Sequence, residues 1–140
     1  MKPASAKQKG RKLQQEVRDR ILDLFQDLEE DDVRSTGMGQ GGEDVQLSPA
    51  ARVRMPYVIE CKWVEKLNVY EAYQQATDHK GDYEPLLIMK KNRKPTLAVV
   101  QVDHLLSLIK NNYEMREFLL DLLAEEGEIY GCCELSRRKT

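Results

Sequence analysis

The chain has 140 residues, of which 41% are hydrophobic and 33% are charged, and its formal net charge is −2. This composition supports one hydrophobic core and excludes a disordered chain, and the length is that of one domain. No stretch approaches the roughly 18 apolar residues of a membrane span. The first twenty residues hold no apolar segment typical of a signal peptide, and three cysteines argue against a disulfide framework, so we expect an intracellular protein.

Basic residues are concentrated in three places despite the acidic net charge. Residues 1–20 hold seven basic side chains against two acidic ones, residues 90–94 hold four, and three more stand at 137–139. Separated basic clusters on a mildly acidic chain indicate a polyanion that is contacted at discrete places. Surface charge that serves only solubility is the alternative interpretation.

The expected elements begin after a flexible basic segment over residues 1–9. Apolar residues at spacings of three and four predict a helix from about Gly10 to Asp31 or Asp32. A glycine-rich loop follows over residues 35–42. Residues 44–47 then read as a short strand, and residues 48–52 read as a turn because Pro49 cannot donate to a strand ladder.

The middle of the chain predicts strands on both sides of a helix. Residues 57–63 form the clearest strand, and Asn68 followed by Glu71 is a capping-box pattern that begins the next helix. Two strands over 86–89 and 96–102 flank the basic turn, and their successive apolar residues predict burial on both faces.

The C-terminal third predicts a short helix over 105–110 and a second helix over 113–126, with an interruption at Asn111 and Asn112. A small strand over 128–134 completes a single domain over 10–134, and a basic tail follows over 135–140. The whole order predicts an α/β (α+β) fold with a mixed central sheet that is covered by helices.

The residues Asp44, Glu60 and Lys62 are the most informative set in the sequence. Glu60 and Lys62 stand two apart on a strand and share one face, whereas Cys61 points the other way, and Asp44 begins the preceding strand. If these strands pair, the two carboxylates meet and repel each other unless a cation lies between them. Mg²⁺ suits such a site, with Mn²⁺ as a substitute, and Lys62 adds a charge that can position water. An ordinary surface pair of Glu60 and Lys62 is the alternative.

These three residues resemble the signature of the PD-(D/E)xK nuclease superfamily, with Glu43 where a proline is usual. Together with the segments 39–52, 59–62, 67–69 and 75–76, they are similar to small virus- or bacterium-encoded Holliday junction resolvases, over residues 10–102. The resemblance implies a restriction-endonuclease-like fold and a magnesium-dependent endonuclease that hydrolyses phosphodiester bonds in branched DNA. It also implies a homodimer that binds four-way junctions, no membrane partner, and the cytoplasm of a bacterium or a virus-infected host cell.

The resemblance also suggests roles for single residues. Asp44 and Glu60 are expected to hold the metal, the backbone carbonyl of Cys61 can join them, and Lys62 is expected to orient water. Gln75 and Glu16 match further catalytic positions, although Glu16 has an alternative partner in Arg20, four residues on. DNA contacts are expected at Ser35, Thr36, Gly39, Gly41, Arg52, Lys90, Lys91, Arg93 and Lys94.

Several alternatives stay open at this point. The same fold and metal site can serve a nuclease for flaps, nicks or ordinary duplex DNA, or a catalytically silent DNA-binding scaffold. Arg52 can contact phosphate or neutralise Glu43, and the glycine loop can be a plain linker. The apolar segment 118–123 can form the dimer interface or cover the sheet.

Overall fold

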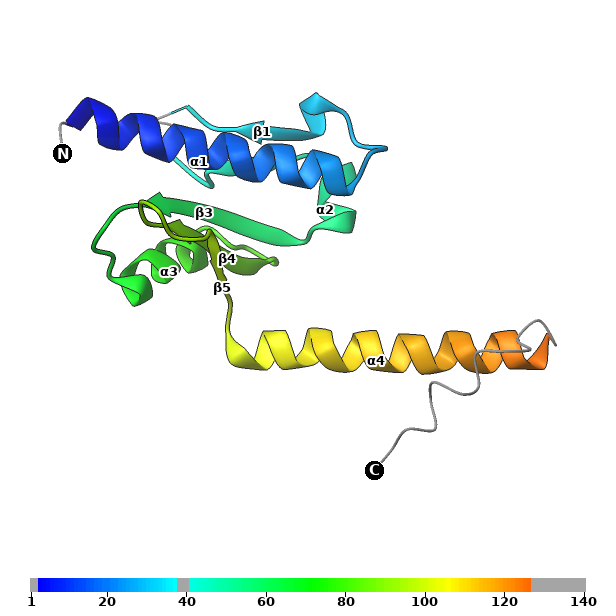
Figure 1. Cartoon of the computed structure of the whole chain (residues 1–140). Helices are drawn as coiled ribbons and strands as arrows, with labels where there is room; N and C mark the ends of the chain where they lie inside the picture. The colour runs from blue at the N-terminus through cyan, green and yellow to red at the C-terminus, as the bar shows by residue number, and fades with distance from the viewer. Residues whose placement is uncertain (1–2, 38–40, 127–140) are drawn as a thin grey trace. The chain divides into compact units, whose positions relative to one another are not determined.

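A computed structural model describes residues 3–37 and 41–126 of the chain. The chain forms two compact units that divide between Val100 and Gln101, where we had expected one domain over 10–134. The first unit holds a five-stranded mixed sheet with helices packed against it (Figure 1). The second unit holds one long helix. The α+β class with a mixed sheet is therefore confirmed.

The first helix, α1 (Pro3–Leu24), starts earlier and ends earlier than expected. Residues 3–9, expected to be flexible, belong to it. It ends before the acidic run at 27–32 because negative side chains are unfavourable at the negative end of a helix dipole. Part of that run forms the 3-10 helix η1 (Glu30–Asp32) instead. The apolar stripe of α1 is buried as predicted, and its most buried member is Leu13.

The five strands lie in the order β1 (Val33–Ser35), β2 (Val45–Leu47), β3 (Tyr57–Trp63), β4 (Glu84–Lys90) and β5 (Leu97–Val99). The β3–β4 pair is parallel and the other three pairs are antiparallel. β3 has the predicted bounds, whereas β1 was not predicted. Leu97 of β5 is exposed, so the expected burial on both faces is wrong for this strand at the sheet edge.

Two short helices have clear N-terminal caps. α2 (Pro49–Arg54) replaces the expected turn, because the Ser48 side chain accepts the Ala51 N–H and Pro49 suits the first helical position. In α3 (Val69–Asp78), the Asn68 side chain accepts the Glu71 N–H at 3.2 Å, as the sequence predicted.

The two faces of β3 serve different helices. Ile59 and Cys61 join the core cluster that includes Leu13 of α1. α1 packs against β1, β2 and β3, and α3 packs against β3 and β4 from the other side of the sheet (Figure 1). Glu60 and Lys62 alternate with Ile59 and Cys61, so they belong to the face that α3 covers.

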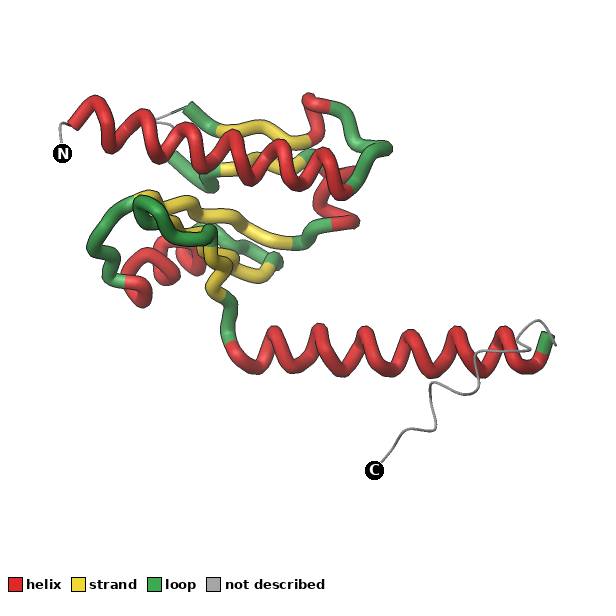
Figure 2. Tube along the Cα trace, viewed as in Figure 1, coloured by secondary structure: helices red, strands yellow, loops and turns green. Residues whose placement is uncertain are grey.

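The second unit is built on α4 (Val102–Glu125), one uninterrupted helix (Figure 2). The expected break at Asn111 and Asn112 is wrong, because an asparagine costs a helix interior only about 0.7 kcal/mol relative to alanine. The predicted strand over 128–134 and the tail over 135–140 lie outside the described residues. Among the helices of the described residues, none has the length and apolar character to cross a membrane.

Candidate functional site

Asp44 lies where β2 and β3 separate. Its N–H donates to the Ile59 carbonyl at 3.0 Å, and its own carbonyl accepts from the Thr36 N–H at 3.0 Å. Next along β3, the Asp44 side chain replaces a backbone carbonyl as the hydrogen-bond partner, because its Oδ2 accepts the Cys61 N–H at 2.7 Å. Thr36 and Ile59 therefore fix the main chain of Asp44, and the Cys61 N–H fixes its carboxylate against β3.

A second side chain reaches Asp44 from α1. Gln14, only 7% exposed, donates from Nε2 to Oδ1 of Asp44 at 2.9 Å. The other atom of this amide, Oε1, is buried and has no hydrogen-bond partner among the described residues. We did not predict Gln14 as a site residue. The available signal was its position beside Leu13, on the flank of the apolar stripe opposite Glu16.

Glu60 and Lys62 form the other half of the site. The Lys62 Nζ lies 2.7 Å from Oε1 of Glu60, and the Glu60 residue is only 7% exposed. This pair shares one strand face, as the period of the strand predicted. It is not the exposed surface pair of the alternative interpretation, because the carboxylate is buried.

The charges of the site are coupled. Burial raises the pKa of Asp44 above its ordinary value, and the negative charge of Glu60 raises it further. The Cys61 N–H, the charge of Lys62 and the Gln14 amide lower it, but they offset only part of the increase. Asp44 and Glu60 are thus close enough to repel each other, and a cation or a proton would relieve that repulsion.

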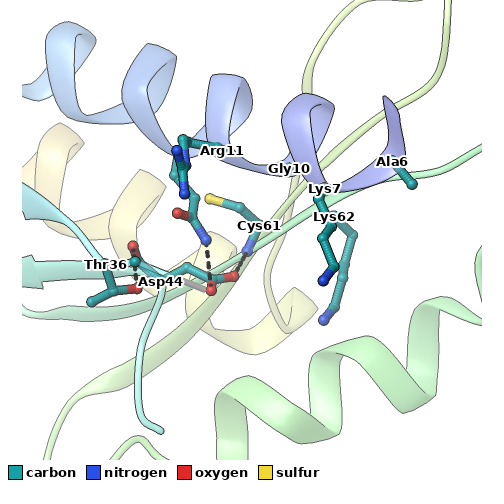
Figure 3. Close-up of a pocket in the computed structure, with 10 residues that line it drawn as sticks. Ala6, Lys7, Gly10, Arg11, Thr36, Asp44, Cys61 and Lys62 are labelled. Carbon is teal, nitrogen blue, oxygen red and sulfur yellow. Dashed lines mark hydrogen bonds between the residues drawn. The ribbon is translucent and has the colours of Figure 1, made fainter. Parts of the chain in front are cut away.

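A pocket of about 340 Å³ opens beside Asp44 (Figure 3). Three cationic side chains, Lys7, Arg11 and Lys62, line it together with Gly10, and Figure 3 shows Lys7 and Lys62 extending side by side. Glu60 does not line this pocket. Asp44 therefore faces the pocket on the α1 side and is coupled to Glu60 on the α3 side.

Cys61 contributes its backbone and not its thiol. The side chain is buried against α1, and burial, with the charges of Asp44 and Glu60, raises the pKa of the thiol far above its ordinary value. A thiol of this kind stays protonated at neutral pH and is a poor nucleophile. The N–H and C=O of one strand residue point to the same neighbouring strand, so the Cys61 carbonyl faces the opening that Asp44 occupies.

Glu16 lies away from Asp44, in an ion-pair network of its own. Its carboxylate is 3.0 Å from Lys90 Nζ and 3.0 Å from Arg20. Burial acts to raise the pKa of Glu16, but these two cations outweigh it and the pKa lies below its ordinary value. Residues two apart on a helix point about 200° apart, which explains why Gln14 and not Glu16 reaches the site.

Gln75 occupies an exposed position on α3, next to the buried Ala76. Its neighbour Gln74 is exposed too and bonds to Asp78 at 2.8 Å. The structure thus places Gln75 on the helix that covers the Glu60 face, with its side chain exposed.

The expected DNA contacts divide into restrained and exposed groups. Thr36 is buried and its hydroxyl donates to the carbonyls of Glu43 and Asp44, so it supports the site backbone. Arg52 pairs with Glu43, donates to the Tyr57 carbonyl and stacks on Tyr83, which is the neutralising role left open above.

The glycine loop is only partly described. Ser35 belongs to β1 and pairs with Val45, and Gly41 is exposed. Gly39 lies outside the described residues.

The basic residues of the turn at 90–94 also fall into a restrained group and an exposed group. Lys90 pairs with Glu16 and lies 4.6 Å from the centre of the Trp63 ring. Lys91, Arg93 and Lys94 are exposed. These three side chains are available to a polyanion, whereas Lys90 is restrained within the fold.

Within residues 3–37 and 41–126, no three His, Cys, Asp or Glu side chains cluster as a metal site. Asp44 and Glu60 are a pair of carboxylates, so further ligands of a cation held here would be amide or backbone oxygens, waters or substrate. No family model matches this chain, and neither a curated protein nor a solved structure matches it. The chemistry of the site therefore has to be argued from its own geometry.

Proposed function

We propose that this protein is a metal-dependent DNA endonuclease that hydrolyses phosphodiester bonds in branched DNA, with four-way junctions as its substrate. The main support is the electrostatic coupling of Asp44, Glu60 and Lys62 at the separation of β2 and β3. A buried carboxylate with a raised pKa, next to a second carboxylate and a lysine, is typical of functional sites. The preference for branched DNA rests on the sequence resemblance.

The residues fit a hard divalent cation such as Mg²⁺, with Mn²⁺ as a substitute. Four groups can offer oxygen: the carboxylates of Asp44 and Glu60, the Oε1 of Gln14, which has no hydrogen-bond partner in the described part of the chain, and the carbonyl of Cys61. Mg²⁺ takes oxygen ligands and is typically held by one or two carboxylates with waters and substrate phosphate. Such an ion supplies positive charge that neutralises the carboxylates and polarises a phosphodiester oxygen.

The remaining steps belong to the chain's own residues. Lys62 holds the attacking water and stabilises the negative charge that develops on the phosphoryl oxygens. The water oxygen bonds to phosphorus as a proton leaves the water, the bond from phosphorus to the 3′ oxygen breaks, and a proton from solvent reaches that oxygen, which leaves a 5′-phosphate and a 3′-hydroxyl. Lys7 and Arg11 line the pocket next to Asp44 and bind the phosphate backbone there.

One cleavage experiment tests this proposal. A four-way junction, a flap, a nicked duplex and a linear duplex are incubated with the full chain, with and without Mg²⁺. We expect Mg²⁺-dependent cleavage of the junction, and no cleavage by the Asp44→Asn or Glu60→Gln variant. Asp23→Asn, which changes an exposed carboxylate of α1, is the matched control and should cleave like the wild type.

The other outcomes are equally informative. Cleavage of flaps, nicks or duplex in preference to the junction would support the active site but contradict the four-way junction as its substrate. Tight DNA binding without cleavage of any substrate would contradict endonuclease activity and indicate a DNA-binding scaffold. Cleavage by Asp44→Asn or Glu60→Gln at near the wild-type rate overturns the assignment of that residue.

A further inference from the structure

α4 carries a broad apolar surface whose side chains are exposed. Large apolar residues run along the whole helix, and none of its residues is buried within the described part of the chain. Charged side chains gather along one flank of this surface, where Lys110 and Glu114 form an ion pair at 3.7 Å. A continuous apolar helix face of this length marks a surface that another element covers.

The apolar residues follow a seven-residue repeat. Leu106, Tyr113 and Leu120 form one series, and Val102, Ile109 and Leu123 form the second, three or four residues away. Positions at these spacings form the seam along which two helices pack in a coiled coil. The second series is interrupted once, by Arg116.

Arg116 decides which partner orientation is possible. In a parallel pair of identical helices, Arg116 would face Arg116 of the second copy, and two like charges would meet in the seam. In an antiparallel pair it can face Tyr113, whose ring can accept the guanidinium by stacking. We propose that α4 pairs antiparallel with α4 of a second copy of this chain.

The register of this pair follows from the same residues. With Tyr113 opposite Arg116, Ile109 meets Leu120 and Leu106 meets Leu123, each contact occurring twice about a two-fold axis. A shift of one repeat either way would place Arg116 against Leu106 or Leu120 and shorten the overlap. The Tyr113 register therefore gives Leu106, Ile109, Leu120 and Leu123 apolar partners, stacks Tyr113 on Arg116, and leaves Val102 at the helix end.

The flanks of the seam agree with this choice. In an antiparallel pair, Lys110 of one copy lies beside Glu117 of the second copy. The two-fold axis repeats this contact, so one flank of the seam carries two opposite-charge pairs. The other flank carries Leu105 and Leu119, which widen the apolar contact. In a parallel pair Lys110 would face Leu105 and lose this partner. Charge complementarity thus favours a second copy of α4 as the occupant.

This inference goes beyond the proposed function, and its test needs no cleavage. The full chain, with Cys132 and Cys133 replaced by serine, is studied by sedimentation equilibrium over a concentration series. We expect a dimer at micromolar concentration. Leu120→Glu should raise the dimer Kd by about 100-fold or more, since it places a charge in the seam. Leu122→Glu, on the opposite side of the same helix, is the matched control and should change it less than about threefold.

Disulfide cross-linking tests the orientation. One protein carries Ile109→Cys and a second carries Leu120→Cys, and the two are mixed and oxidised. The antiparallel register predicts a mixed disulfide as the main product, whereas a parallel pair gives each protein linked to itself. A monomeric wild type, an unaffected Leu120→Glu variant, an equal loss in Leu122→Glu, or self-linked products each overturn the proposal.

Discussion

Gln14 Nε2 donates a 2.9 Å hydrogen bond to Oδ1 of Asp44, and this bond fixes which way the amide faces. The amide oxygen cannot take that position, because it would meet a carboxylate oxygen. Oε1 is left buried and without a partner among the described residues. An acceptor in this state costs about 1–3 kcal/mol unless a donor or a cation reaches it. The metal proposal gives this oxygen a partner.

The first prediction replaces this amide with a carboxylate. Gln14→Glu puts a third negative charge next to Asp44, which should lower the free energy of unfolding by roughly 1–2 kcal/mol at neutral pH without metal. Mg²⁺ or Mn²⁺ should restore more stability to this variant than to the wild type, because binding to the folded state stabilises it. Thermal melts with and without metal measure both effects.

Gln15→Glu is the control for this prediction, because residue 15 is exposed on the same helix. It adds the same charge and should change the melting temperature little in either condition. A Gln14→Glu variant as stable as Gln15→Glu would contradict the position of Gln14. A destabilised variant that does not respond to metal would contradict the metal site alone.

The second prediction concerns the pH dependence that Asp44 imposes on stability. The folded state raises its pKa, so it binds this proton more tightly than the unfolded state, where the ordinary value is 3.8. The stability that this difference contributes is fully present below pH 3.8 and is lost as the pH rises through the folded pKa. The stability of the wild type relative to Asp44→Asn should therefore fall over that interval and then level off.

Urea unfolding of both proteins at a series of pH values, without metal, measures this difference. Comparing the two proteins removes the contributions of most other titrating groups, because they are common to both. A difference that rises with pH would mean that the pKa of Asp44 is lowered in the fold, and that Cys61 and Lys62 outweigh burial.

The central strand and its site were predictable because their signals are local. The alternation of polar and apolar residues from Tyr57 to Trp63 determines which side chains share a face, and it placed Glu60 with Lys62. The cap of α3 depends on two residues three apart, Asn68 and Glu71, and was predicted for the same reason. The position of Asp44, directly before β2, then depended on the pairing of β2 with β3.

What the sequence did not predict depends on tertiary contacts. Gln14 and Glu16 flank the same apolar stripe, and only the position of β2 relative to α1 decides which of them meets Asp44. β1 has three residues and no alternation long enough to recognise. The continuity of α4 through Asn111 and Asn112 reflects a small helix penalty that its neighbours outweigh.

The third prediction is a stabilising change in α1. Gly10 lies inside the helix, and a Cβ added there meets no atom within 4 Å. Gly10→Ala should raise the free energy of unfolding by about 0.8–1 kcal/mol, because alanine favours the helix more than glycine does. Urea unfolding measures this. The same variant narrows the pocket beside Asp44, so weaker DNA binding together with higher stability would indicate that nucleic acid approaches the helix at this glycine.

The fourth prediction separates the two groups of basic residues by the salt dependence of DNA binding. Replacing Lys7 and Arg11 with alanine should flatten the plot of log K against log salt by up to about 0.9 per lost phosphate contact. If the basic turn binds the DNA phosphate backbone, replacing the exposed residues Lys91 and Lys94 with alanine should flatten the same plot.

The control for this measurement replaces Lys12 and Lys66, two exposed cations that do not line the pocket. It corrects for the general loss of positive charge. A slope that changes equally in the control and in the pocket variant would show that Lys7 and Arg11 make no specific phosphate contact.

The fifth prediction concerns Lys62. The structure indicates that its removal lowers the free energy of unfolding more than the loss of an exposed lysine would. Its partner Glu60 is buried, so the pair is not an exposed salt bridge worth only about 0–1 kcal/mol. Lys62→Ala should leave an unpaired buried carboxylate and lower the free energy of unfolding by about 1–3 kcal/mol at neutral pH. Adding Glu60→Gln removes that charge and should recover much of the loss.

The effect of Lys62 on catalysis is measured separately, by single-turnover cleavage of a four-way junction at saturating protein and at a temperature where the variants remain folded. Lys62→Ala should lower the rate roughly 10²–10³-fold, as the loss of a preorganised charge-stabilising group does. Lys62→Gln should retain more activity if hydrogen bonding to water matters more than charge. Junction affinity should change little, because Lys7 and Arg11 remain. A rate within about threefold of the wild type, the spread expected of a context-dependent surface contact, would remove Lys62 from the mechanism. In that case the ion pair of Lys62 with Glu60 would be only a structural feature of β3.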